Sequence, residues 1–222
     1  MSRWEIQIAL LISAGVVAIS IPPASAVESV PGVAIAVLET LPVKGRAPKT
    51  GYSRDAFGQR WADVDRNGCD TRNDILKRDM TSIVYKAKTR NCVVLSGTLI
   101  DRYSGETINF VRGDVSSMEV QIDHVVALSN SWQTGAFKLS ITQRAALAND
   151  PLNLFAVKGR LNSQKGDGDA ATWLPPLKSF RCAYVAQQIA VKAKYSLWVV
   201  PPEKAAMLSI LAKCPTQKLP VS

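Results

Sequence analysis

Apolar residues toward the carboxyl end of the chain recur with the period of an α-helix in two successive segments. Within residues 181–197 the positions that share this spacing are Val185, Ile189 and Ala193. After Pro201-Pro202 the corresponding positions are Met207, Ile210, Leu211 and Cys214. Because a short link containing proline separates the two segments, the pattern predicts two antiparallel helices.

The preceding part of the chain alternates between short helical and strand-like patterns. Helices are predicted at 53–62, 71–80, 128–136, 141–149 and 158–165. Strands are predicted at 92–101 and 107–111, joined as a β-hairpin around Tyr103-Ser104-Gly105, around Asp123-His124, and at Asn153–Val157. Mixed helices and strands without an internal repeat predict an α+β fold, with one domain over residues 51–222.

The first 50 residues carry a different pattern. An apolar run from Ile6 to Ile21 is followed by Pro22-Pro23 and by Ala24-Ser25-Ala26, the small-residue pattern that a signal peptidase cleaves. We therefore expect residues 1–26 to be a signal peptide; an uncleaved membrane anchor is the alternative, although the run is shorter than the roughly 20 residues that span a bilayer. Residues 27–50, with three prolines, are expected to form a largely extended arm.

Four cysteines follow this segment, and an even number in an exported chain indicates two disulfides. Three pairings are possible. Two antiparallel C-terminal helices would bring Cys182, at the start of the first, beside Cys214, at the end of the second. That pairing leaves Cys69 with Cys92, closing a loop around one predicted helix.

Composition narrows the function. The chain has 27 Lys and Arg against 18 Asp and Glu, a net charge of +9, which favours polyanionic partners such as nucleic acid, anionic lipid or acidic glycan. It contains one histidine, His124. A zinc site with two histidines and an acid–base pair of two imidazoles are therefore excluded.

The residues that carry chemistry lie between Val120 and Asp167. Asp123 and His124 fall in one predicted strand, where neighbouring side chains point to opposite faces, and Asn162 lies in the helix predicted after the next strand. A carboxylate and an amide oxygen suit a hydrated hard cation such as Mg²⁺, and a neutral imidazole beside it can deprotonate water. This set predicts a one-metal hydrolase site, and a hydrogen-bonded structural Asp–His pair is the alternative.

At this point the sequence resembles the HNH (His-Me finger, ββα-metal) endonucleases, and it is most similar to exported proteins related to the nuclease part of the GmrSD restriction enzymes. The resemblance runs from about Gly51 to Cys214. It is carried by five fragments in order: Asn67-Gly68-Cys69-Asp70-Thr71-Arg72, Asp123-His124-Val125-Val126, Asn149-Asp150-Pro151-Leu152-Asn153-Leu154, Asn162-Ser163-Gln164-Lys165-Gly166-Asp167 and Trp173-Leu174-Pro175-Pro176.

The resemblance implies a ββα-metal motif within the mixed domain and a role for each matching residue. Asp123 and Asn162 would hold Mg²⁺ or Mn²⁺, His124 would be the general base, and Asn153 would brace the loop that positions His124. Asn162 stands where the name of the motif expects histidine, which leaves the preferred ion open.

Basic residues near these motifs have two interpretations. Arg160 and Lys165 on the predicted helix, and Arg72 further upstream, are candidates for contacts to substrate phosphate, and a solvated helix face is the alternative for the first two. A second motif, Asp63, Asp65, Asn67 and Asp74, has the spacing of a calcium loop. Asp74 replaces the usual bidentate Glu, so a polar turn that caps the following helix is the preferred interpretation.

Together these observations predict a secreted, monomeric, metal-dependent endonuclease. It would hydrolyse DNA, with RNA as a further candidate substrate, through contacts to the phosphate backbone and with little sequence specificity. No stable membrane insertion is expected once the signal peptide is removed. The alternative is a non-catalytic basic protein on the same scaffold that binds extracellular DNA or a cell-wall polyanion.

Overall fold

The computed structural model describes residues 32–113 and 118–220, together with Met1. Its α-helices are α1 (Ala34–Thr40), α2 (Thr71–Asp79), α3 (Leu128–Gln133), α4 (Ile141–Asn149), α5 (Gly159–Lys165), α6 (Arg181–Lys194) and α7 (Pro201–Leu211). Its strands are β1 (Met80–Tyr85), β2 (Val94–Ile100), β3 (Thr107–Val111), β4 (Val120–His124) and β5 (Leu154–Lys158). The α+β expectation is confirmed.

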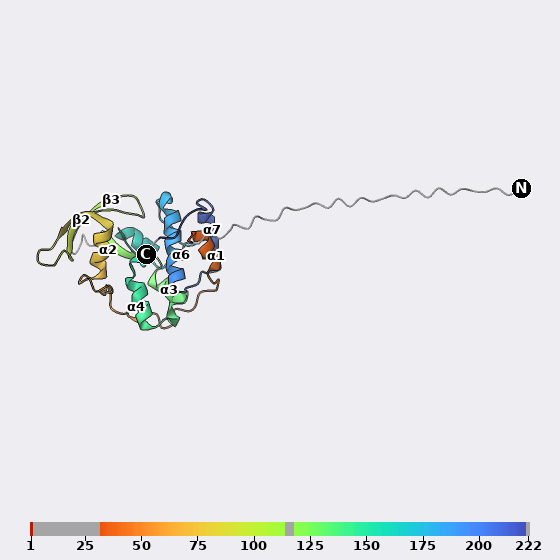
Figure 1. Ribbon diagram of the computed structural model, residues 1–222, viewed down its shortest axis with the longest axis horizontal. Coiled ribbons are helices and arrows are strands. Elements are labelled where there is room, and N and C mark those ends of the chain that lie inside the picture. The colour runs from red at the N-terminus through yellow and green to blue at the C-terminus, as the bar shows by residue number, and fades with distance from the viewer. Residues whose placement is uncertain (2–31, 114–117, 221–222) are drawn as a thin grey trace.

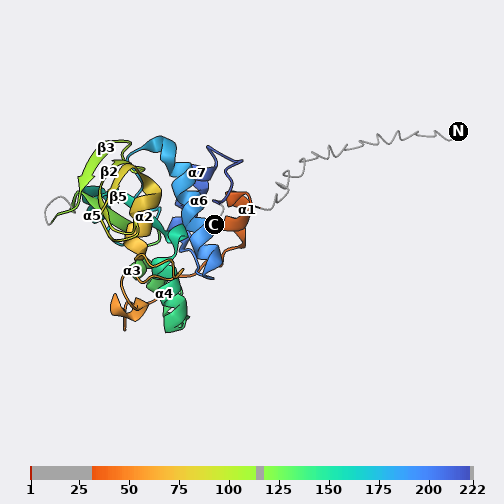
Figure 2. The same cartoon turned by 60° about the vertical axis from the view of Figure 1, so that its left-hand side comes forward.

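Two groups of helices and strands lie at opposite ends of the molecule. Figures 1 and 2 show α1, α6 and α7 together at one end, and α2 with the β2–β3 hairpin at the other. The strands form a three-stranded antiparallel sheet in the order β1-β2-β3 and a separate antiparallel pair, β4 and β5. No described helix has the length and apolar character that crossing a membrane requires.

Of the two predictions for the amino-terminal residues, the structure tests only one. The predicted signal peptide, residues 1–26, lies outside the described residues apart from Met1. The prediction of a largely extended arm at 27–50 is wrong for Ala34–Thr40, which form α1. Ala34 and Leu38 are fully buried against α6 and α7, because Ala-Ile-Ala-Val-Leu supplies an apolar helix face. The prolines on either side of this segment led to the prediction of an extended chain.

Two further predictions need correction. The helix expected at 53–62 is a single 3₁₀ turn at Asp55–Phe57, ended by Gly58, whose φ of 78° favours glycine. The strand β1 was not predicted, since it directly follows α2 and its pairing with β2 is irregular between Thr81 and Tyr85. Those irregularities break the strict alternation by which a strand is recognised.

The β4–β5 pair lies between two parts of the hydrophobic core. Leu154 and Ala156 of β5 pack with α2 and the three-stranded sheet, whereas Phe155 and Val157 pack on the side of α6 and α7. Both faces of β5 are therefore buried, which explains its uninterrupted apolar sequence.

The C-terminal helices form as predicted and are joined in two ways. Cys182–Cys214 links the start of α6 to the turn after α7, and Cys69–Cys92 encloses α2, so both predicted disulfides are confirmed. Lys192 of α6 and Glu203 of α7 form a buried ion pair with 3.0 Å between Nζ and a carboxylate oxygen. Lys192 also donates a hydrogen bond to the Trp198 carbonyl, so the link between the helices is tied to both of them.

Candidate active site

The residues predicted to carry chemistry lie on a compact ββα unit formed by β4, β5 and α5. The strands pair so that Asp123 lies opposite Phe155 and His124 opposite Leu154, and α5 follows β5 directly and packs on both strands. Gly159 makes this turn possible, because a Cβ at that position would lie 1.9 Å from the Met118 carbonyl oxygen. The glycine is required here by a close approach of two backbone segments.

His124 is the last residue of β4 and is 8% exposed. Its Nε2 lies 2.9 Å from the Ala148 carbonyl oxygen, which can only accept a hydrogen bond, so Nε2 carries the proton. Nδ1 then keeps its lone pair, and no described residue hydrogen bonds to it. Burial lowers the pKa of His124 to about 3, and Arg54, Lys165 and Arg60 add to this effect against the opposing hydrogen bond to Ala148, so the ring is neutral at pH 7.

Asp123 points to the other face of β4 and is 4% exposed. Its Oδ1 accepts a hydrogen bond from Lys165 Nζ at 2.9 Å, and its Oδ2 accepts one from the Tyr103 hydroxyl at 2.5 Å. Burial and the Asp123 charge raise the pKa of Tyr103 well above its ordinary value, so its hydroxyl remains a donor. The carboxylate is therefore held in one orientation by a cation and a phenol.

Asn162 brings α5 to the same side of β4. Its Nδ2 donates to Gln121 Oε1 at 2.8 Å, two residues before Asp123 on the same strand face. Its Oδ1 accepts no hydrogen bond from a described residue. Asp123 and His124 of β4 and Asn162 of α5 all line one cavity of about 220 Å³.

Asn153 fixes the loop that follows His124. It is completely buried just before β5; its Oδ1 accepts from the Val126 backbone N–H at 2.8 Å and its Nδ2 donates to the Val126 and Leu147 carbonyls. Its own carbonyl accepts from the Val125 N–H. It thus holds the backbone of the two residues that directly follow His124.

The donor set at this cavity fits one hydrated divalent ion. Asp123 keeps a second lone pair on each carboxylate oxygen, and the Asn162 oxygen is free, so the protein could supply two oxygen ligands and water the others. Over residues 32–113 and 118–220, no group of three or more His, Cys, Asp or Glu side chains is arranged to hold a metal. The described residues therefore form no site with three or more carboxylate, imidazole or thiolate ligands, whereas the donors at this cavity fit a Mg²⁺-type site with several waters.

Comparison with known proteins identifies the family of this chain. Residues 70–210 match the family described as GmrSD restriction endonucleases, C-terminal domain. The chain belongs to this family. It is also similar to an "Uncharacterized secreted protein" of Arthroderma benhamiae, with 37% identity over 197 residues that cover 88% of each chain. No solved structure matches. The secreted relative and the two disulfides confirm the expectation of a secreted protein.

Within this member of the GmrSD C-terminal domain family, the residues predicted to contact phosphate are differently placed. Lys165 is not on a solvated helix face: its side chain is fully buried, and its ammonium donates to Asp123 and to the His124 carbonyl at 2.7 Å. That prediction is corrected, because a buried, paired ammonium is not available to a substrate phosphate. Arg72 is half-buried and reaches toward the Val120 carbonyl, and Arg160 is exposed on α5; neither lines the cavities beside His124.

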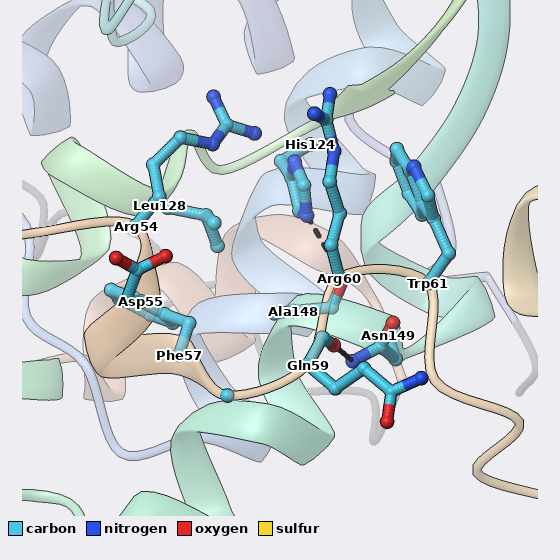
Figure 3. Close-up of a pocket in the computed structure, with 11 residues that line it drawn as sticks. Arg54, Asp55, Phe57, Gln59, Arg60, Trp61, His124, Leu128, Ala148 and Asn149 are labelled. Atoms are coloured by element: carbon cyan, nitrogen blue, oxygen red, sulfur yellow. Dashed lines mark hydrogen bonds between the residues drawn. The ribbon is translucent and has the colours of Figure 1, made fainter.

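Two arginines that the sequence analysis did not single out lie at the site instead. Arg54 lines the cavity that contains Asp123 and Asn162, and it also lines a second cavity that borders His124; Arg60 lines only the second cavity. Both are exposed, and neither guanidinium forms a hydrogen bond or ion pair with a described residue. Figure 3 shows both side chains extending toward the side on which His124 lies. No motif marked them, because some 64 to 70 residues separate them from His124 and the fold alone brings them together.

Asp167 is a further member of the site that was missed as a functional candidate. It lines the cavity with Asp123 and Asn162 and accepts hydrogen bonds from Lys49 at 2.6 Å and from the Ser129 hydroxyl at 3.1 Å. The Lys49 hydrogen bond, followed by that of Ser129, lowers the pKa of Asp167 despite partial burial. Its position two residues after the end of α5, just beyond Gly166, was the available signal.

The loop with calcium-like spacing acts as a polar turn. The Asp63 carboxylate accepts the backbone N–H groups of Asn67 and Gly68, and Asp65 accepts from Asn67. Asp70, not a loop ligand, caps α2 by accepting the Asn73 N–H at 2.8 Å. Asp74 lies in the first turn of α2, where burial raises its pKa. These contacts follow the preferred interpretation of the loop, a turn that leads into a capped helix.

Proposed function

We propose that this protein is an exported, metal-dependent endonuclease that hydrolyses phosphodiester bonds in DNA, with RNA as a further candidate substrate. In the proposal His124 is the general base, and Asp123 and Asn162 hold one Mg²⁺ or Mn²⁺. Asn153 positions His124, and Arg54 and Arg60 take the phosphate-binding role. Family membership connects the chain with nucleases, and the finer assignments rest on the geometry of the cavity.

One observation carries the proposal. The only histidine has its Nε2 proton fixed by the Ala148 carbonyl and its Nδ1 left free, in the same cavity as an oriented carboxylate and an unpartnered amide oxygen. A histidine with a purely structural role would be expected to use both ring nitrogens when buried. A free, neutral Nδ1 has the lone pair that a general base needs.

The reaction follows from these positions. His124 Nδ1 removes a proton from a water molecule, whose oxygen forms a bond to phosphorus while the opposite P–O bond breaks. The departing oxygen takes a proton from solvent, and the imidazolium later returns its proton to water. A divalent ion, when bound, would stabilise the negative charge that develops on the phosphate and on the departing oxygen. Lys165 and Tyr103 keep the Asp123 carboxylate in place throughout.

Substrate binding in this proposal depends mainly on charge. Arg54 and Arg60 are exposed and unpaired beside His124, and the chain carries a net charge of +9. Contacts of this kind bind the backbone of nucleic acid with little dependence on base sequence and weaken as salt is added.

The test is cleavage of supercoiled plasmid by the purified protein in Mg²⁺, in Mn²⁺ and in EDTA. We expect nicking that needs the divalent ion and is lost in His124→Ala, because the chain contains no second imidazole. Arg160→Ala serves as a matched control on the same molecule, since Arg160 is exposed but does not line the cavity. Circular dichroism and DNA binding should show that His124→Ala remains folded.

Two outcomes would overturn the proposal. Cleavage at the parent rate by folded His124→Ala would exclude the mechanism. Plasmid binding without cleavage in either metal would instead support the alternative function, a non-catalytic binder of extracellular polyanions.

A further inference from the structure

A second cavity, of about 200 Å³, also borders His124. It is formed by the segment from Arg54 to Trp61 and by the carboxyl end of α4, and it shares Arg54, His124 and Leu128 with the cavity lined by Asp123 and Asn162. Figure 3 shows its lining. Of the residues that line this cavity, the proposed reaction uses His124, Arg54 and Arg60, and it gives no role to Trp61 or Asn149.

Asn149 lines this cavity and has an unsatisfied hydrogen-bond acceptor. The residue is 1% exposed, and its Oδ1 is buried without a hydrogen-bond partner among the described residues. Its Nδ2 donates to the Ala145 carbonyl at 2.9 Å and lies 3.5 Å from the Gln59 carbonyl. The amide cannot be turned over, because the oxygen would then face two carbonyls. A ligand that satisfies Asn149 Oδ1 must therefore supply an N–H or O–H donor.

Trp61 gives the same cavity an aromatic wall. Its indole is nearly parallel to the His124 ring, with 12° between the planes and 5.9 Å between the centroids. Its backbone has a φ of 56°, a left-handed conformation that an aromatic residue rarely adopts and that the surrounding structure must maintain. The Arg60 guanidinium lies 5.7 Å above the indole ring. A flat aromatic surface, a buried acceptor and nearby cations together match a nucleotide.

We propose that this cavity is a nucleobase subsite. It would receive a base that carries an exocyclic amino group, from the nucleotide adjoining the scissile phosphate, with that amino group donating to Asn149 Oδ1. Arg54 borders both cavities and would bind the phosphate between them. Cytosine, adenine and guanine carry such an amino group, and thymine does not. The inference rests on the proposed nuclease function and adds to it a preference for the base next to the cut.

The test measures binding in the absence of cleavage. Isothermal titration in EDTA compares deoxycytidine 5′-monophosphate with deoxyribose 5-phosphate, which keeps the sugar and phosphate and lacks the base. We expect the nucleotide to bind the parent protein roughly 5- to 10-fold more tightly, the contribution of about one hydrogen bond to a buried acceptor. Asn149→Leu should remove this difference and leave the affinity for deoxyribose 5-phosphate unchanged.

Asn130→Leu is the matched control. Asn130 is a second buried asparagine with unpartnered amide atoms, but it does not line the cavity, so its replacement should leave the ratio of affinities unchanged. If Asn149→Leu does not fold, Trp61→Leu decides instead, with the same loss of the ratio expected.

The outcomes separate the two proposals. Equal affinities for the two probes in the parent protein, no measurable nucleotide binding at millimolar concentration, or an unchanged ratio in the deciding variant would overturn the subsite. Because the titration needs neither metal nor cleavage, base-dependent nucleotide binding by a protein that does not nick plasmid would refute the nuclease function and leave the subsite standing.

Discussion

The buried pair between Lys165 and Asp123 makes the sharpest prediction of stability. Lys165→Met keeps much of the length and the apolar stem of the side chain and removes the ammonium. The Lys165 side chain is fully buried and that of Asp123 is 4% exposed, so water would replace the lost ammonium poorly. Asp123 would keep the Tyr103 hydroxyl at 2.5 Å, and the His124 carbonyl would lose its hydrogen bond from Lys165.

The magnitude follows from this burial. Removal of one partner from a buried ion pair costs about 3–5 kcal/mol, because a desolvated charge is left uncompensated. An exposed pair would cost about 0–1 kcal/mol. Replacing both partners, in Asp123→Asn with Lys165→Met, removes the orphan charge, so the double variant should be more stable than Lys165→Met alone.

Urea denaturation followed by circular dichroism measures all four proteins of this cycle. We expect the free energy of unfolding to fall by about 3–5 kcal/mol in Lys165→Met and to recover in part in the double variant. Mg²⁺ should also raise the melting temperature of Lys165→Met more than that of the parent, since the uncompensated carboxylate attracts the cation more strongly. A loss below about 1 kcal/mol in Lys165→Met would show that the pair is solvated, and the reasoning would fail.

Three further predictions concern cleavage and folding. Asp123→Ala and Asn162→Ala should each strongly reduce plasmid cleavage, and the loss in the double variant should be far below the product of the two single losses. Excess Mg²⁺ should partly restore cleavage by Asn162→Ala. If the cleavage rate of both variants depends on Mg²⁺ concentration as that of the parent does, neither residue holds the metal. Arg54→Ala should weaken DNA binding and reduce its log–log salt slope by about one unit, whereas Arg160→Ala should change little; equal effects in filter binding would contradict the placement of Arg54. Gly159→Ala should lower the free energy of unfolding by about 1–3 kcal/mol, because its Cβ meets the Met118 carbonyl, and an unchanged urea midpoint would refute that contact.

Local patterns in the sequence were sufficient for much of the fold. The helix at 71–80, the β-hairpin, the two C-terminal helices and both disulfides were predicted, because each depends on periodicity, turn residues or short-range geometry. The arm at 27–50 was misjudged, since whether Ala34–Thr40 form a helix depends on the face of α6 and α7 that they cover. The strand β1 was not predicted, because its irregular pairing with β2 leaves no regular alternation in the sequence.

For the candidate site, too, the sequence was sufficient for some features and the tertiary structure was needed for others. The sequence by itself determined which residues could do chemistry, since Asp123, His124, Asn153 and Asn162 occur in ordered motifs and the chain has one imidazole. Tertiary structure alone decided which charges are usable: it buried Lys165 against Asp123 and brought Arg54 and Arg60 to His124 across more than 60 residues. The sequence around a lysine does not show whether its ammonium is exposed to water or paired with a buried carboxylate. The difference is one of solvation, and solvation is set by what the rest of the chain packs around the side chain.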